Sequence, residues 1–143
     1  MADLSFTAAN VRDASPVGIG KKVTMIAGVA ITAGQAVYIN SSGNAVLADA
    51  SAAGTAVCIG IALQSVSAGQ AFPVQIDGYV TGFDLSSLAY NALVTVSDTA
   101  GDLDSGGSPT VTAPVGRVWA LTDADRTKVL FINCSYNLNV VPA

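Results

Sequence analysis

The feature of this sequence that most constrains its fold is an internal repeat. A pattern of about 45 residues runs from Ile31 to Ile76 and recurs from Leu88 to Ile132. Each copy contains a strand-like run, a turn with a glycine, a loop of small residues, a second strand, another turn and a last strand. Two copies are too few for a solenoid, so the repeat predicts a small, pseudo-symmetric all-β sandwich or barrel.

The first copy shows how clearly the strands are marked. Gln35–Ile39 is rich in β-branched and aromatic residues, Asn40–Asn44 is a polar turn with a glycine, and Ala45–Leu47 resumes the apolar pattern. This combination predicts a β-hairpin. The continuous apolar run Val57–Leu63 predicts a buried strand. In the second copy, Val115–Leu121 takes the place of this run.

Less regular signals follow in the middle of the chain. Phe72–Ile76 and Gly78–Val80 read as two further strands. Pro73 cannot donate a main-chain hydrogen bond, so we expect the first of these strands to lie at a sheet edge or to begin there. A short helical turn is compatible with the residues around Leu85–Tyr90.

The composition agrees with an all-β protein. Charged residues make up 11% of the 143 residues, where about 25% is typical. Glutamate is absent, and lysine occurs at three positions. Because Glu and Lys normally cover the outside of soluble helices, their scarcity argues against a helical fold. The length corresponds to one ordinary domain.

The low charge also bears on association. A surface with few charges promotes contact between molecules, and the mean hydropathy is +0.53. We therefore favour a surface that is partly covered by other subunits, hence a homo-oligomer. The alternative is a small, alanine-rich β domain with no such partner.

The first part of the chain differs from the rest. Residues 1–21 are polar, lack stable periodicity and contain Pro16, Gly18 and Gly20, which predicts an extended arm outside the core. Residues 22–143 then form a single β domain. The arm is either a disordered terminus or a segment that orders on a partner by adding a strand to a sheet edge. Its candidate contact residues are Leu4, Phe6, Val11, Arg12 and Val17.

The residue types needed for catalysis are scarce. The chain has no histidine and no glutamate, so no serine has an evident base to activate it. Nearly all aspartates fall in predicted turns, where their side chains bond nearby backbone groups. The segment Asp98–Asp104 has oxygen ligands and a glycine, but it lacks the spacing of a calcium loop. We expect no enzyme, no metal and no cofactor.

Charge and hydropathy exclude two classes of partner. The net charge is −4 and Lys21–Lys22 is the one adjacent basic pair, so a nucleic-acid surface is not expected. The most apolar stretch, Val23–Ala33, is too short to span a bilayer, and the N-terminus lacks the apolar core of a signal peptide. We expect a soluble protein that is made in the cytoplasm and does not bind membranes.

Two cysteines, Cys58 and Cys134, lie far apart in the sequence and are flanked by strand-like residues. A domain of this length does not need a covalent staple. We therefore favour two buried free thiols over one disulfide.

Three runs resemble a known family. They are AGQAVYINSSGNAVLADASAAGTAVCIGIAL, AGQAFPVQIDGYVTGF and ALVTVSDTAGDL. In their order and small-residue pattern they are similar to the small capsid decoration, or cement, proteins of tailed bacteriophages. The resemblance covers residues 27–132 and includes neither the arm nor the last residues. No catalytic residue defines this family, so none is transferred.

The resemblance implies a function. Such proteins bind the outside of an expanded icosahedral head, often as trimers, and reinforce it against the pressure of the packaged DNA. The expected partners are the major capsid protein and further copies of this chain. The expected location is the outer capsid surface of a virion.

A second hypothesis comes from a different class of protein. A small β domain could be a carbohydrate- or ligand-binding module of a phage fibre or host-attachment protein. An exposed Trp119 or Tyr79 lining a groove would favour this hypothesis.

Overall fold

The fold is described for residues 3–16, 19–105 and 109–134 of a computed structural model. It is all-β, as predicted. The strands are β1 (Lys21–Ile26), β2 (Ala36–Ile39), β3 (Ala45–Leu47), β4 (Gly60–Ala62), β5 (Ala71–Val80), β6 (Leu93–Val96), β7 (Leu103–Asp104), β8 (Pro114–Ala120) and β9 (Lys128–Asn133). Two short 3-10 turns cover Ala8–Asn10 and Ala53–Thr55.

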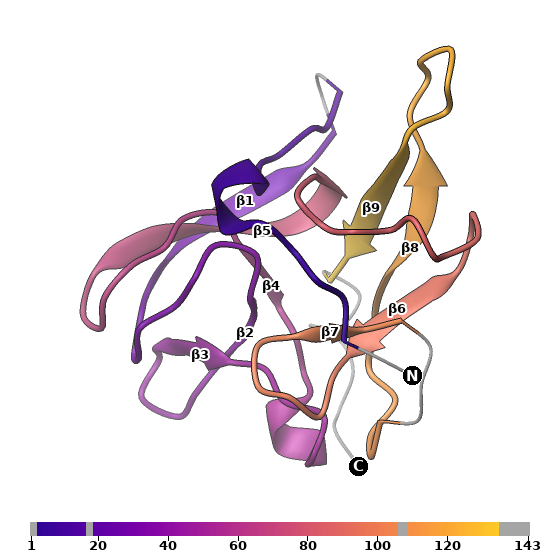
Figure 1. Cartoon of the computed structure of the whole chain (residues 1–143). Coiled ribbons are helices and arrows are strands. Elements are labelled where there is room, and N and C mark those ends of the chain that lie inside the picture. Colours follow the sequence, from indigo (N-terminus) through magenta and orange to yellow (C-terminus); the bar gives the residue numbers. More distant parts are fainter. Residues whose placement is uncertain (1–2, 17–18, 106–108, 135–143) are drawn as a thin grey trace.

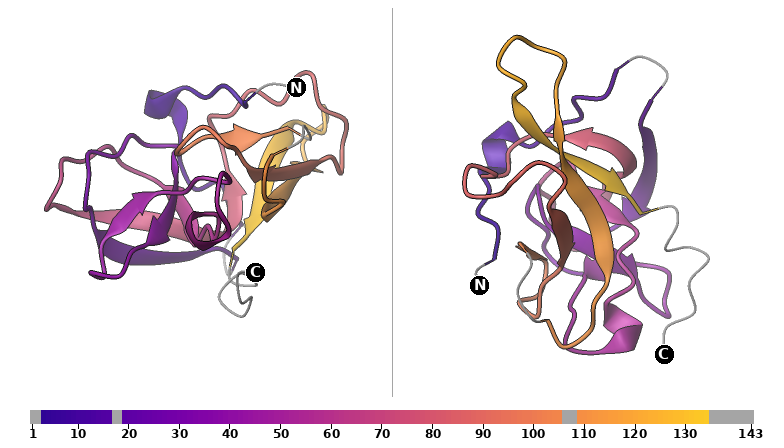
Figure 2. Two further views of the ribbon diagram at one scale, coloured as in Figure 1. Left: turned by 90° about the horizontal axis from the view of Figure 1, so that it is seen from below. Right: turned by 90° about the vertical axis from the view of Figure 1, so that its right-hand side faces the viewer.

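All strands belong to one antiparallel sheet that curls strongly (Figures 1 and 2). The order is β3-β2-β4-β5-β9-β8-β6-β7, and β1 pairs with β5 in addition. This order reads the same from both ends when β2, β3, β4 and β5 are matched with β6, β7, β8 and β9. The sheet therefore has two similar halves that meet where β5 pairs with β9.

The predicted hairpin is confirmed. Val37 pairs with Leu47 and Ile39 with Ala45, so β2 and β3 are joined by the turn that contains Gly43. Gly43 has a φ of 84°, a conformation that glycine adopts without strain. The corresponding strands of the second half, β6 and β7, are joined by a turn with Gly101 at a φ of 85°.

The core lies inside the curled sheet, because side chains alternate across each strand. Val118 of β8 and both Leu130 and Ile132 of β9 point inward and are fully or almost fully buried. Their neighbours Arg117, Trp119 and Phe131 point to the outer face. A second, smaller cluster surrounds Phe72 and Val74 in the first half of the sheet. The main cluster spans both halves of the sheet, because it includes Ala36 and Ile61 of the first half as well as Val94 and Val118 of the second.

The expectation for Pro73 is wrong. Residues 72–76 and 78–80 form one continuous strand, β5, and Pro73 lies within it between β1 and β4. The carbonyl oxygen of Pro73 accepts a hydrogen bond from the backbone N–H of Leu63, just beyond the end of β4. A missing N–H is tolerated here because β4 is short and ends before it could continue the ladder.

The expectation that the arm lies outside the core is also wrong. The backbone N–H of Leu4 donates to the carbonyl of Leu103, and Ala14 donates to Tyr79. Leu4 and Val11 are 5% and 6% exposed and belong to the main core cluster. The arm therefore docks along the sheet of its own chain, where it bonds backbone groups of β5 and β7.

The region around Leu85–Tyr90 forms hydrogen-bonded turns instead of a helix. The N–H of Leu88 donates to the carbonyl of Leu85. Leu85 is buried in the main core cluster and fixes this connection between the two halves of the sheet.

Candidate functional site

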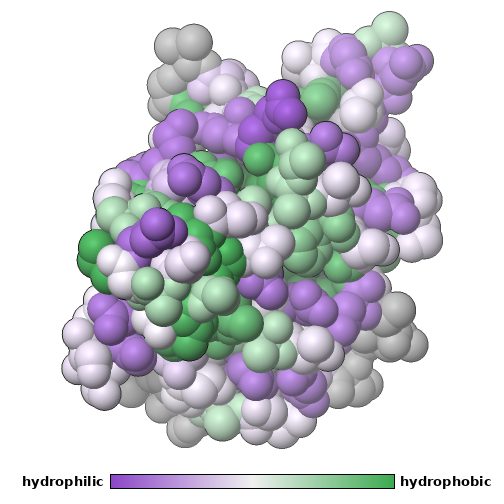
Figure 3. Space-filling model, turned by 60° about the vertical axis from the view of Figure 1, so that its left-hand side comes forward, coloured by the Kyte–Doolittle hydropathy of each residue, from purple (hydrophilic) through white to green (hydrophobic). Residues whose placement is uncertain are grey.

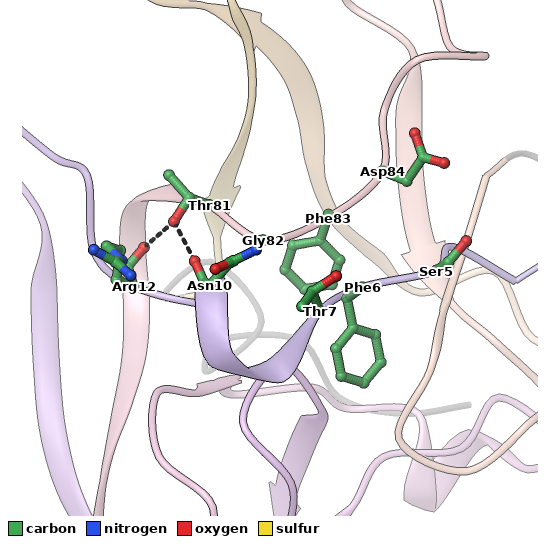
Figure 4. A pocket seen from close by; sticks show the side chains of 9 residues that line it. All are labelled: Ser5, Phe6, Thr7, Asn10, Arg12, Thr81, Gly82, Phe83 and Asp84. Atoms are coloured by element: carbon green, nitrogen blue, oxygen red, sulfur yellow. Dashed lines mark hydrogen bonds between the residues drawn. The ribbon is translucent and has the colours of Figure 1, made fainter.

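A groove of about 670 Å³ lies where the N-terminal arm crosses the segment Thr81–Asp84 (Figure 4). The rings of Phe6 and Phe83 meet here with centroids 5.7 Å apart. The Thr81 hydroxyl donates to the carbonyl of Asn10 at 2.8 Å, and its second interaction reaches the carbonyl of Arg12. The groove is therefore made mostly by contacts that hold the arm in place.

The five candidate residues of the arm differ in how far they are buried in the structure. Leu4 and Val11 are buried in the main core, so their side chains could meet a partner only if the arm were released. Phe6 is half-buried and Arg12 is exposed, and both line the groove. Val17 lies outside the described residues. The structure thus brings two of the five together at a surface.

A buried polar residue anchors the arm beside β5. The side-chain amide nitrogen of Gln75, a fully buried residue, lies 3.2 Å from an Asp13 carboxylate oxygen. The other carboxylate oxygen of Asp13 accepts from Lys22 Nζ at 2.8 Å. Burial tends to raise the pKa of Asp13, but hydrogen bonds from Lys22 and Ser15 outweigh it and lower the pKa.

A second surface is the outer face of the second half of the sheet, which we call the aromatic face. It consists of Tyr79, Arg117, Trp119, Phe131 and Asn133. Cross-strand pairing of Phe131 with both Tyr79 and Arg117 places their side chains in one row. Trp119 is 45% exposed, and its ring lies 5.3 Å from that of Phe131. A groove of about 440 Å³ runs beside this pair.

A third surface surrounds the edge strand β1 in the first half of the sheet, and we call it the apolar face. It includes four large hydrophobic residues that are at least 39% exposed, namely Val23, Ile26, Val29 and Ile39. Val23 and Ile26 project from opposite sides of β1, because side chains alternate along a strand. Figure 3 shows hydrophobic residues gathered over a broad area on this side of the molecule. Clustered exposed apolar side chains mark contact surfaces more often than scattered ones do.

Strand β1 gives this face an open edge. The carbonyl of Pro73 points toward β4, so by alternation Phe72 and Val74 face β1. The backbone groups of their partners Met25 and Val23 therefore hydrogen-bond to β5. The N–H and carbonyl groups of Thr24 point the other way, toward the open side of β1. In the described part of the chain no strand covers that side of β1 until Ala27 meets Ala45. Such an edge can accept a further strand.

Most carboxylates hold turns together, as the sequence predicts. Asp49 accepts from the N–H of Ser51, and Asp84 accepts from that of Ser86. Asp98 accepts hydrogen bonds from both the N–H and the hydroxyl of Thr110. These aspartates are fixed by structural hydrogen bonds within loops.

One pair of carboxylates is different. The pKa of Asp102 is raised by partial burial and by the neighbouring carboxylate of Asp3. Asp3 is exposed and also accepts a hydrogen bond from the hydroxyl of Ser97. Because both carboxylates reach solvent, their proximity produces a like-charge repulsion at the surface of the protein.

The two cysteines are the other groups with reactive chemistry. Neither forms a disulfide and both are fully buried, as predicted, and their Sγ atoms lie 3.9 Å apart. The pKa of Cys134 is raised well above its ordinary value by the hydrogen bond with Cys58 and by burial. Among residues 3–16, 19–105 and 109–134, no three His, Cys, Asp or Glu side chains are grouped to hold a metal ion.

The sequence signals these surfaces unevenly. It marks Trp119 and Tyr79 as possible groove residues, and Trp119 does line the groove of the aromatic face. The sequence does not reveal the apolar face, because nothing in the residues of a strand such as Val23 and Ile26 shows which of its sides is left uncovered. A six-residue strand in which all but one residue is exposed is visible only once its pairing is known.

The fold and its surfaces define an all-β protein with three candidate contact surfaces. No helix in the described residues is both long and apolar enough to cross a membrane. Comparisons with protein-family models, curated proteins and solved structures found no match.

Proposed function

We propose that this chain is a capsid decoration protein that binds the outer surface of an expanded phage head and stabilises it. The proposal begins from the resemblance of residues 27–132 to that family. The observation that carries it further is the apolar face beside the open edge of β1. A protein that works by covering another protein needs such a surface and needs no catalytic group.

The contact would combine two kinds of interaction. Thr24 offers outward main-chain groups to an added strand of the major capsid protein. Val23 and Ile26, 40% and 45% exposed on opposite sides of β1, would both have apolar surface removed from water beside the added strand. Each copy could bind weakly, because a homo-oligomer that engages several shell subunits gains avidity. The family resemblance suggests a trimer.

Because the arm is docked on the core, deleting it cannot test whether it binds the shell. Removing residues 1–20 would take Leu4 and Val11 out of the core, so weakened binding by the trimmed protein would not implicate the arm. Substitutions of exposed residues avoid this problem. Val23→Asp alters the apolar face, and Thr122→Asp adds the same charge at an exposed turn far along the chain.

The test is sedimentation of each protein with expanded empty shells of the major capsid protein encoded beside it. Wild type and Thr122→Asp should co-sediment, while Val23→Asp should bind at least about tenfold more weakly because a charge would be buried at the contact. Shells with bound wild type should also break at higher temperature. Failure of the wild-type protein to bind expanded shells would contradict the proposal. Equal binding by Val23→Asp would move the contact to another surface.

The second candidate is a carbohydrate- or ligand-binding module of a fibre or host-attachment protein. One observation favours it, namely the exposure of Trp119 beside a groove. The aromatic face does not overlap with the residues of the apolar face. The two functions can therefore be tested by separate substitutions.

A further inference from the structure

The side chains of the aromatic face are arranged regularly, and none of them belongs to the apolar face that is proposed to bind the shell. Leu93, Arg117, Phe131 and Tyr79 are cross-strand neighbours on β6, β8, β9 and β5. Their inward neighbours, including Val118 and Leu130, are buried in the core. The rigid sheet therefore holds these side chains at fixed spacing on its outer side.

The centre of this face is formed by three rings in contact. The centroid of Phe131 lies 5.3 Å from that of Trp119 and 5.7 Å from that of Tyr79. The Trp119 and Phe131 planes are tilted by 43°, whereas Tyr79 meets Phe131 nearly edge-on at 83°. Phe131 and Tyr79 are half-buried, which leaves the 45% exposed Trp119 as the main stacking surface.

Hollows lie on two sides of the rings. The groove of about 440 Å³ is bordered by Trp119, Phe131, Arg117 and Asn133. A second hollow of about 410 Å³ is bordered by Tyr79, Leu121 and Asp123. An elongated ligand that crosses the rings could place groups in both.

The polar groups at the rim decide which ligand class fits. Arg117 only donates hydrogen bonds, and one of its five N–H groups is used by the carbonyl of Asn91 at 2.8 Å. Asn133 can donate and accept, and Asp123 at the second hollow only accepts when ionised. An anionic ligand would be repelled by Asp123, and a cationic ligand would be repelled by Arg117. A neutral ligand rich in hydroxyl groups can satisfy both.

Pyranose sugars combine the two properties that this face requires. One side of the ring is a flat array of C–H groups that can lie on an exposed aromatic ring, and its hydroxyl groups both donate and accept hydrogen bonds. Ligand sites with aromatic walls and a few placed polar groups follow the same logic. We propose that the aromatic face binds a neutral oligosaccharide, with a sugar ring stacked on Trp119 and its hydroxyl groups directed to Arg117 and Asn133.

Trp119 provides a direct readout because it is the single tryptophan of the chain. The full-length protein is titrated with maltohexaose, cellohexaose, chitohexaose and mannohexaose while its tryptophan emission is recorded. At least one of them should produce a saturable change at millimolar concentration or below. An acidic oligosaccharide of uronate units serves as the comparison ligand.

Variants separate stacking from general loss of structure. Phe131→Ala should weaken the binding of the responsive sugar about three- to tenfold, the range expected for one aromatic contact. Trp119→Ala, followed by calorimetry because it lacks the fluorophore, should abolish measurable binding. Tyr38→Ala removes a ring from β2 in the other half of the sheet and should change nothing. Thermal unfolding of each variant checks that it is folded.

Several outcomes would overturn this assignment. These are no saturable response to any neutral sugar, binding of the uronate oligosaccharide alone, or undiminished binding by Trp119→Ala. Shell binding is independent of it, so Trp119→Ala should still co-sediment with expanded shells. Loss of both activities in that variant would mean that the two sites are not separate.

Discussion

Gly60 and Gly116 occupy equivalent places in the two halves of the sheet. Gly60 pairs with Val37 of β2, and Gly116 pairs with Val94 of β6. A Cβ atom on Gly60 would overlap the carbonyl oxygen of Gln75, and one on Gly116 would overlap that of Phe131. The repeated glycine therefore allows two neighbouring strands to approach closely at the same point of each half.

Replacing either glycine should destabilise the protein strongly. Because the overlapping atoms belong to backbone within the sheet, neither Gly60→Ala nor Gly116→Ala can be relieved by a side-chain rotation. We expect each to lower the free energy of unfolding by about 2 kcal/mol or more, in the range of overpacked cores. Urea denaturation measures this loss.

Gly54→Ala is the matched control, because a Cβ there meets no atom within 4 Å. It should be neutral or slightly stabilising. A Gly116→Ala protein as stable as Gly54→Ala would show that the strands can separate without cost.

These glycines also show what the sequence could reveal. The match between Gly60 and Gly116 is visible in the repeat, and so are the turns at Gly43 and Gly101. The hairpins and the all-β class follow from such local signals, because turns and alternating strands depend on neighbours in the chain.

Long-range relationships could not be predicted in this way. Leu4 and Val11 sit in a polar segment without periodicity, so their burial depends on a groove that forms only when β5 and β6–β7 are in place. The position of Pro73 inside the sheet depends on the length of β4, which no local signal reveals. The exposure of Val23 likewise depends on how far the neighbouring strands extend along β1.

The docked arm predicts that its apolar residues stabilise the fold. Leu4→Ala should lower the free energy of unfolding by roughly 2 kcal/mol or more, because the substitution leaves a cavity in the main core. Arg12→Ala, at an exposed position one residue after Val11, should change it by less than about 0.5 kcal/mol. Thermal and urea unfolding provide the comparison. If Leu4→Ala were as stable as wild type, the arm would not contribute to the core in solution.

The adjacent thiols should be inert in the folded protein. Cys58 and Cys134 have no exposed surface, and the raised pKa of Cys134 keeps that thiol protonated at neutral pH. Because the thiolate is the reactive form, an aromatic disulfide reagent should label neither residue in the native state. Both should react once the protein is unfolded in guanidinium chloride. Rapid labelling of the native protein would contradict the buried geometry.

The Asp3–Asp102 pair predicts a pH-dependent effect on stability. The pKa of Asp102 is raised in the folded state, so the folded protein holds this proton more tightly than the unfolded chain does. Ionised Asp102 therefore costs stability at neutral pH. This cost disappears as the pH falls through the raised pKa and below the unfolded value of 3.8.

Asp102→Asn should accordingly be more stable than wild type at pH 7, by less than about 1 kcal/mol because the pair is solvent-screened. The difference should vanish near pH 3, where the aspartate is protonated in both states. Asp125→Asn makes the same change of charge in an exposed turn and should show no comparable gain. Thermal unfolding of the three proteins across this pH range measures the effect. A gain that persists unchanged at pH 3 would mean that the introduced amide stabilises the loop by new hydrogen bonds and not by relieving the repulsion from Asp3.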